Sequence, residues 1–127
     1  MPSFEQTITF LHASDLGPLA RFYSGLLGLP LVRDQGSCIL FQSAPGAYLG
    51  FCSHLTAGQK EGVILTFVAE DVDGWYARLQ AQGVVFLGPP VHNPKFQIYH
   101  CLLRDPNGYL LEIQKFDQPL AKCEEPA

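Results

Sequence analysis

The side chains of this 127-residue chain that could do chemistry are four histidines, four cysteines and a small set of carboxylates. His12, Cys52, His100 and Glu112 are residue types that bind divalent metals or transfer protons. Their spacing matches no common motif, because the sequence contains no HEXXH, no glycine-rich phosphate loop and no Gly-x-Ser-x-Gly turn. A histidine on a pocket wall also forms a hydrogen bond more often than it binds a metal. The motifs therefore predict neither a catalytic residue nor a set of metal ligands.

The composition predicts a folded chain in a reducing compartment. With 47% hydrophobic and 16% charged residues, the sequence is too apolar to be disordered. The net charge of −4, with Lys and Arg scattered singly, provides no basic surface for nucleic acid or an anionic membrane. No apolar run approaches the ~20 residues of a membrane span, and no charged n-region opens the chain. We expect a cytoplasmic protein with reduced thiols, because Cys38, Cys52, Cys101 and Cys123 include no CxxC pair.

An internal repeat organises the sequence. Residues 8–15 align with residues 64–71, and each segment is rich in β-forming residues and ends in Asp. Each Asp is a good helix N-cap, and the residues after it carry apolar side chains at i, i+3, i+4 and i+7. Gly28 and Gly83 then predict the helix ends. The repeat therefore predicts a strand followed by a helix in each half of the chain.

Turn-like sequences divide the rest of each half into short apolar strands, which complete a βαβββ pattern twice. Module 1 covers about residues 5–55 and module 2 about residues 62–116, followed by a tail at 117–127. One module is too small to cover both faces of its sheet, so we expect residues 1–127 to form a single domain. The further strands are expected at 31–33, 37–42, 47–53, 84–87, 97–104 and 109–116.

Two motifs resemble those of the vicinal oxygen chelate superfamily, which includes glyoxalase I, fosfomycin-resistance enzymes, extradiol dioxygenases and bleomycin-resistance proteins. They are Asp15-Leu-x3-Ala-x-Phe-Tyr-Ser-x-Leu-Leu-Gly-Leu and Asp105-Pro-Asn-Gly-Tyr-Leu-Leu-Glu112. The resemblance covers residues 8–116. It implies an α+β fold in which two βαβββ modules form cupped mixed sheets, with helices on the convex side and a cavity on the concave side. It specifies the fold more closely than the function, because this scaffold carries several activities.

The resemblance also identifies the positions that hold a divalent ion in metal-dependent members of the superfamily. In this sequence they are Ile8, Gly50, Ile64 and Glu112, of which only Glu112 can donate a lone pair. A divalent cation needs several oxygen or nitrogen donors. We therefore expect no metal and no other cofactor. Glu112 is then a remnant of the motif, a solvated carboxylate at the cavity mouth, or a contact for a cationic or hydrogen-bonding group of a ligand.

Strand alternation on this fold directs a mainly apolar set of side chains into the cavity. Such a wall is typical of a site for a flat or amphipathic organic molecule, on which aromatic rings can stack. The predicted ligand-binding residues are Ile8, Phe10, His12, Tyr48, Cys52, Ile64, Thr66, Phe96, His100, Leu102 and Glu112.

Three functional hypotheses follow. The leading one is a metal-free, non-catalytic protein of the bleomycin-resistance type, which sequesters a small hydrophobic or aromatic compound such as an antibiotic and, like those relatives, forms a homodimer. The alternative is a glyoxalase-like lyase or isomerase, or a dioxygenase-related enzyme, with a non-standard site using His12, His100 and Glu112. The third is a structural or regulatory subunit whose cavity is filled by its own core.

Overall fold

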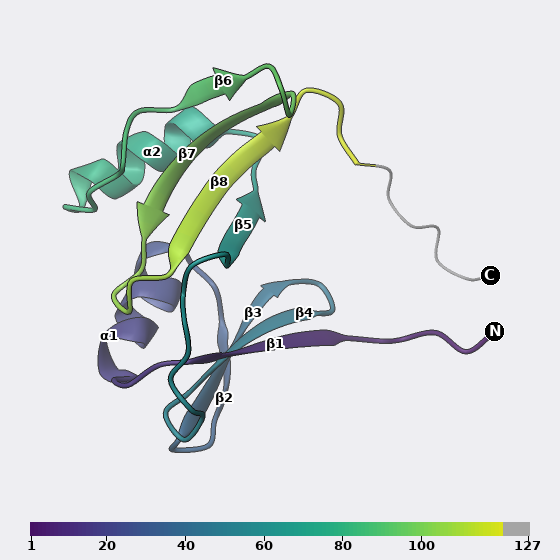
Figure 1. Ribbon diagram of the computed structural model, residues 1–127, viewed down its shortest axis with the longest axis vertical. Helices are drawn as coiled ribbons and strands as arrows, with labels where there is room; N and C mark the ends of the chain where they lie inside the picture. The colour runs from purple at the N-terminus through teal and green to yellow at the C-terminus, as the bar shows by residue number, and fades with distance from the viewer. Residues whose placement is uncertain (121–127) are drawn as a thin grey trace. The chain divides into compact units, whose positions relative to one another are not determined.

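The computed structural model of the chain describes residues 1–120. Its strands and helices follow the predicted repeat, with one helical region after the first strand of each half (Figure 1). The predicted α+β fold of two βαβββ modules is confirmed. The elements are β1 (Thr7–His12), α1 (Gly17–Leu19), a π-helix (Ala20–Leu26), β2 (Leu31–Asp34), β3 (Cys38–Ala44), β4 (Ala47–Cys52), β5 (Ile64–Val68), α2 (Val72–Ala81), β6 (Val91–Asn93), β7 (Ile98–Arg104) and β8 (Leu110–Phe116).

The chain divides into two compact units, each with its own four-stranded sheet. The first unit contains Met1–Glu61 and Asp105–Gly108, and the second contains Gly62–Arg104 and, among the described residues, 109–120. The strand order is β1-β4-β3-β2 in the first unit and β5-β8-β7-β6 in the second. In both sheets the first two strands of that order are parallel and the other pairs are antiparallel. The single domain remains a prediction, and residues 121–127 of the predicted tail lie outside the described residues.

Both predicted N-cap aspartates bind backbone N–H groups. Asp71 is the N-cap of α2, and its Oδ1 accepts a hydrogen bond from the Gly74 N–H at 2.8 Å. Asp15 Oδ1 accepts from the Gly17 N–H at 3.0 Å, although α1 begins one residue later than predicted and has Leu16 in the N-cap position. A shift of one residue is common at helix ends, where the first turn lacks intrahelical hydrogen bonds.

The predicted helix ends are also confirmed. Gly28 and Gly83 have φ values of 76° and 90°, a left-handed conformation that is unfavourable for residues with a Cβ atom. Their N–H groups bind the carbonyl oxygens of Ser24 and Gln80, respectively. These glycines therefore end the two helical regions in the way that the sequence predicts.

The strand predicted at 84–87 is wrong. Within that segment only Phe86 forms a β-bridge, with Leu103, and the edge strand β6 lies instead at Val91–Asn93. The intervening Pro89 and Pro90 have no N–H group to donate to β7. The two prolines therefore interrupt the edge of the sheet, and regular pairing begins only after them.

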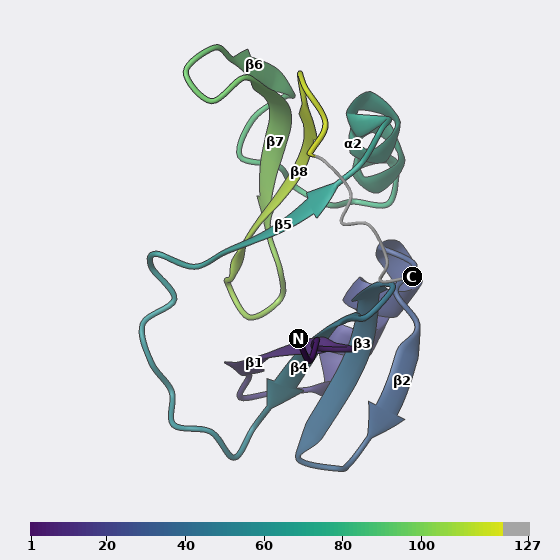
Figure 2. The same ribbon diagram turned by 90° about the vertical axis from the view of Figure 1, so that its right-hand side faces the viewer.

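An aromatic cluster forms the core of the first unit. The Tyr23 ring lies 5.4 Å from the Phe41 ring and 4.8 Å from the Phe51 ring, and all three side chains are fully buried. The Tyr23 hydroxyl donates a 2.7 Å hydrogen bond to Oδ2 of the buried Asp105. This bond helps to attach the segment Asp105–Gly108 to the first unit, whose sheet Figure 2 shows with β2, β3 and β4 side by side.

In the second unit, α2 covers one face of the sheet. Leu79 of α2 is fully buried, as are Leu103 of β7 and Leu111 of β8. The core of this unit therefore lies between α2 and the sheet, and the opposite face of the same strands is free of helices within the unit (Figure 1). Among residues 1–120, no helix has the length and apolar character needed to span a membrane.

Candidate functional site

Burial along β5 follows the predicted alternation, and burial along β1 does so except at Thr9, which is exposed. On β1, Leu11 is buried while Ile8 and Phe10 are exposed, and on β5, Leu65 is buried while Ile64 and Val68 are exposed. Alternate residues of a strand point to opposite faces of its sheet. In each sheet the exposed side chains therefore lie on the face opposite the helix of that unit, where the sequence predicts the cavity-lining residues.

A pocket of about 230 Å³ lies on this face of the first unit. Ile8 and Tyr48 contribute to it as direct neighbours on the parallel strands β1 and β4. The Gln6 side-chain amide donates a 3.1 Å hydrogen bond to the Tyr48 hydroxyl. Two predicted residues, Ile8 and Tyr48, are therefore brought together, and four others were missed by the sequence analysis. The complete lining is Gln6, Ile8, Val32, Arg33, Leu40 and Tyr48.

The sequence contained a signal for one of the missed residues. Leu40 lies opposite Gly50 in the antiparallel β3–β4 pair, so it shares the face of a residue already placed toward the cavity. Val32 and Arg33 gave no such signal, because adjacent residues of a regular strand point to opposite faces. They line one pocket because the register between β2 and β3 shifts between Leu31 and Arg33.

The Phe10 ring covers Gly50 on the neighbouring strand. A Cβ atom built on Gly50 would lie 2.6 Å from Cδ1 and 2.7 Å from Cε1 of Phe10. Such distances are shorter than any ordinary carbon–carbon contact. The ring therefore occupies the space that a side chain at residue 50 would need, and Gly50 is the residue that allows this close approach.

In the second unit, the strands equivalent to β1 and β4 are β5 and β8, and they carry polar side chains. Thr66 Oγ1 donates a 2.8 Å hydrogen bond to Glu112 Oε1, and these two residues are paired across β5 and β8. His100 Nδ1 lies 2.6 Å from Glu112 Oε2. When Glu112 Oε2 is the acceptor of this hydrogen bond, His100 Nδ1 is its donor and Nε2 of the neutral ring is the acceptor nitrogen.

In this second-unit cluster, Thr66–Glu112–His100, the histidine and the carboxylate are sheltered, whereas Thr66 is exposed. The side chains of His100 and Glu112 are 15% and 13% exposed, respectively. Leu102, another predicted residue, is paired with Glu112 across β7 and β8 and is half-buried. That these four residues line a cavity remains a prediction of the sequence, which did not predict the hydrogen bonds among them.

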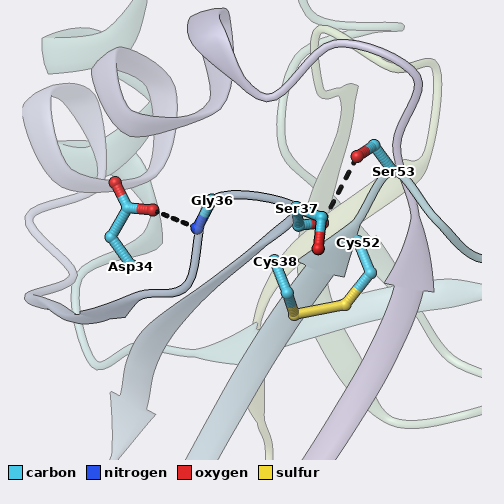
Figure 3. The surroundings of a disulfide bond; sticks show 6 residues. All are labelled: Asp34, Gly36, Ser37, Cys38, Cys52 and Ser53. Carbon is cyan, nitrogen blue, oxygen red and sulfur yellow. Dashed lines mark hydrogen bonds between the residues drawn. A yellow bond between two sulfur atoms is a disulfide. The ribbon is translucent and has the colours of Figure 1, made fainter.

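Cys52 forms a disulfide bond with Cys38, which lies directly opposite it on β3 with a Cα–Cα distance of 4.1 Å (Figure 3). The prediction of reduced thiols is therefore wrong for this pair. The reason is the β3–β4 register, which brings together two residues that are 14 positions apart in the sequence. Cys101 is a buried free thiol, and Cys123 lies outside the described residues.

The remaining predicted residues lie in three places. His12 is paired with Cys52 across β1 and β4 in the first unit, whereas His100 and Glu112 belong to the second unit. Phe96 is exposed between β6 and β7, with Nζ of Lys95 5.3 Å from its ring centroid. Ile64 is exposed on β5. Of the three residues predicted for the alternative site, His100 and Glu112 are in contact, and His12 belongs to the other unit.

Two groups with shifted pKa values lie on the helix-covered face of the second sheet. Burial raises the pKa of the Cys101 thiol to about 11, and the negative charges of Asp73 and Glu112 act in the same direction. The Tyr99 hydroxyl donates a hydrogen bond to Asp73 of α2, and this bond raises the pKa of Tyr99. Both groups are therefore protonated near neutral pH, where a thiol or phenol is a poor nucleophile.

The family model of the Glyoxalase/Bleomycin resistance protein/Dioxygenase superfamily matches residues 7–113. The match covers most of the chain, and the chain therefore belongs to this superfamily. Among curated proteins, none shows significant sequence similarity to the chain.

Several solved structures share the fold of this chain. A lactoylglutathione lyase from Agrobacterium tumefaciens is similar with 23% identity and a TM-score of 0.72, covering 90% of this chain and 95% of its own. TioX from Micromonospora sp. ML1 has 18% identity and a TM-score of 0.72, with 87% and 97% covered. A glyoxalase/bleomycin resistance protein/dioxygenase from Nocardioides has 20% identity and a TM-score of 0.73, with 99% and 91% covered. At these identities the likeness concerns the fold.

The residues at the metal positions implied by the superfamily do not fit a metal ion. Ile8 and Ile64 have aliphatic side chains, and the space beside Gly50 is filled by the Phe10 ring. Glu112 supplies carboxylate oxygens, but both already accept hydrogen bonds within the Thr66–Glu112–His100 cluster. In the part of the chain that the structure describes, no three His, Cys, Asp or Glu side chains gather as a possible metal site. The absence of a metal stays a prediction, and it rests on these side chains.

Proposed function

We propose that this chain is a metal-free binding protein that sequesters a small hydrophobic or aromatic compound, as in drug resistance. The observation that carries the proposal is the apolar surface of the first unit, where Phe10 covers Gly50 and aliphatic side chains line a pocket. Burial of apolar ligand surface against such side chains contributes roughly 25 cal/mol per Å². Membership of a superfamily that includes bleomycin resistance proteins supports an antibiotic as one class of ligand.

A neutral fluorescent probe tests this function. N-phenyl-1-naphthylamine brightens in an apolar site, and it should bind one site per chain in excess chelator. Ile8→Ala and Tyr48→Ala, which remove apolar wall from the pocket, should each weaken binding about 5–10-fold, or roughly 1–1.4 kcal/mol. Val85→Ala, at an exposed position of the second unit, is the control and should bind as the wild type does. Loss of binding on adding chelator, or equal binding by all variants, would overturn the proposal.

The predicted homodimer is part of the same proposal. Ile8 and Phe10 in the first unit and Ile64 and Val68 in the second remain exposed on strands. Within each unit the two side chains lie on the same face of its sheet, and exposed apolar side chains on a sheet face often mark an interaction surface. Light scattering on the purified protein should give twice the chain mass of 14.0 kDa. A monomer at every concentration tested would contradict this part of the proposal.

A second candidate function has one specific observation in its favour, the 2.6 Å contact between His100 and Glu112. A carboxylate that accepts from Nδ1 orients an imidazole so that Nε2 can remove a proton from a substrate. This arrangement supports a lyase or isomerase that acts next to a carbonyl group. We also propose that His12 takes part in this acid–base chemistry and that the protein is cytoplasmic, as the sequence predicts.

Deuterium exchange distinguishes the two functions. Lactoylglutathione, incubated with the protein in D₂O and chelator, would lose the NMR signal of its α-proton if His100 removes that proton. The His100→Gln variant should then exchange no faster than buffer, while Val85→Ala exchanges as the wild type does. If the wild type itself shows no exchange above buffer, the acid–base function for this thioester is rejected and the binding function is unaffected.

A further inference from the structure

The polar groups at the first-unit pocket are mainly hydrogen-bond donors. Arg33 has five N–H groups and no acceptor. The Tyr48 oxygen already accepts from the Gln6 amide, so its O–H remains to be donated. No Asp or Glu lines the pocket. The site therefore offers positive charge and donors beside an apolar wall.

The charge of Arg33 is not neutralised by the protein. Arg33 forms no ion pair with any carboxylate between residues 1 and 120. The adjacent residue, Asp34, uses Oδ1 to accept a 2.8 Å hydrogen bond from the Gly36 N–H in the β2–β3 turn (Figure 3). Lys115, by contrast, is paired with Glu70 at 2.9 Å. A cation without an acidic partner beside a pocket is suited to an acidic ligand group.

The backbone places Arg33 at this pocket. In a regular β2, Val32 and Arg33 would point to opposite faces of the sheet. The register shift between Leu31 and Arg33 lets both residues line the pocket, so an aliphatic side chain and a guanidinium lie on one wall. Bulges that redirect a side chain in this way occur often beside functional sites.

From this arrangement we infer that the first-unit pocket takes an amphipathic organic acid, with its ring or chain against Ile8, Val32 and Leu40 and its acid group on Arg33 and the Tyr48 hydroxyl. This inference rests on the proposed binding function and names the chemical class of its ligand. Charge-assisted hydrogen bonds are roughly twice as strong as neutral ones, so the acid should bind better than a neutral molecule of the same shape. The carboxylate then makes the acid bind more tightly than the neutral molecule, while the apolar wall contributes affinity to both molecules.

A matched pair of probes tests the inference. We would measure 2-naphthoate and the neutral 2-naphthamide by displacement of N-phenyl-1-naphthylamine, with the wild type, R33Q, R33K and R21Q. Arg21 is an exposed arginine of the same unit on the π-helix, so R21Q removes the same charge away from the pocket. The wild type and R21Q should prefer naphthoate about tenfold. R33Q should lose this preference and keep its affinity for naphthamide within twofold, and R33K should retain part of the preference.

The outcomes separate the two proposals. If the wild type binds both probes equally, or if R33Q keeps the preference for naphthoate, the inference about Arg33 is overturned while the binding function stands. If neither probe displaces N-phenyl-1-naphthylamine, the inference is overturned for this pocket. If N-phenyl-1-naphthylamine itself fails to bind, the proposed function fails together with the inference. Circular dichroism of each variant checks that the fold is retained.

Discussion

The effect of Gly50→Ala on stability should depend on Phe10. The added Cβ would lie 2.6 Å from Cδ1 of Phe10, whereas carbon atoms in contact are about 3.5–4.0 Å apart, so the ring must leave the surface of β4. Phe10 is already 52% exposed. The loss is therefore about half of the roughly 1.5–3 kcal/mol that full burial of Phe contributes, or about 1 kcal/mol.

The alanine also brings a gain that does not depend on Phe10. Glycine within a strand is less stable than alanine by roughly 0.5–1 kcal/mol, because its backbone has more freedom in the unfolded chain. With Phe10 present, the gain and the loss nearly cancel. In the F10A background only the gain remains, so F10A/G50A should be more stable than F10A by about 0.5–1 kcal/mol. The coupling between the two positions should be about 1 kcal/mol.

A double-mutant cycle measures this coupling. Urea unfolding of the wild type, G50A, F10A and F10A/G50A is followed by far-UV circular dichroism, because Trp75 belongs to the second unit and its fluorescence would report on that unit. Gly58→Ala, whose Cβ would meet no atom within 4 Å, is the control and should have the same effect in both backgrounds. Equal effects of G50A with and without Phe10 would refute the close contact and the argument that the ring fills this position.

Three further predictions concern stability. Reduction of the Cys38–Cys52 disulfide, which closes a loop of 14 residues, should lower the free energy of unfolding by about 3 kcal/mol in urea, and an unchanged midpoint would contradict this. As the pH rises from 9 to about 11, the free energy of unfolding should fall, because the Cys101 thiol loses its proton in the unfolded chain and keeps it in the folded one. C101V should remove this contribution to the slope of unfolding free energy against pH, and an identical slope in C101V and the wild type would argue against it. Tyr23→Phe removes a buried hydrogen bond to Asp105 and should lower the free energy of unfolding by about 1.5–3 kcal/mol, measured by thermal or urea unfolding. A change near zero would contradict this prediction.

Elements fixed by local interactions were predictable. The N-cap at Asp71 and the left-handed glycines at Gly28 and Gly83 depend on residues within one or two turns of the same helix. The edge strand of the second sheet was misplaced because apolar character alone predicted pairing at 84–87. Pro89 and Pro90 decided where that strand lies, because they cannot donate hydrogen bonds to β7.

The sequence by itself determined the repeated fold and which side chains of β1 and β5 lie on the sheet face opposite the helix of their unit. It also determined that Ile8 and Ile64 are aliphatic at two of the metal positions that the superfamily resemblance implies. These features follow from side-chain type and a period of two along each strand. Only the tertiary structure decided which cysteines pair, that Phe10 covers Gly50 and that Arg33 joins the pocket. Each of these depends on the register or a bulge between separate strands, and a shift of one residue would turn the side chains to the other face.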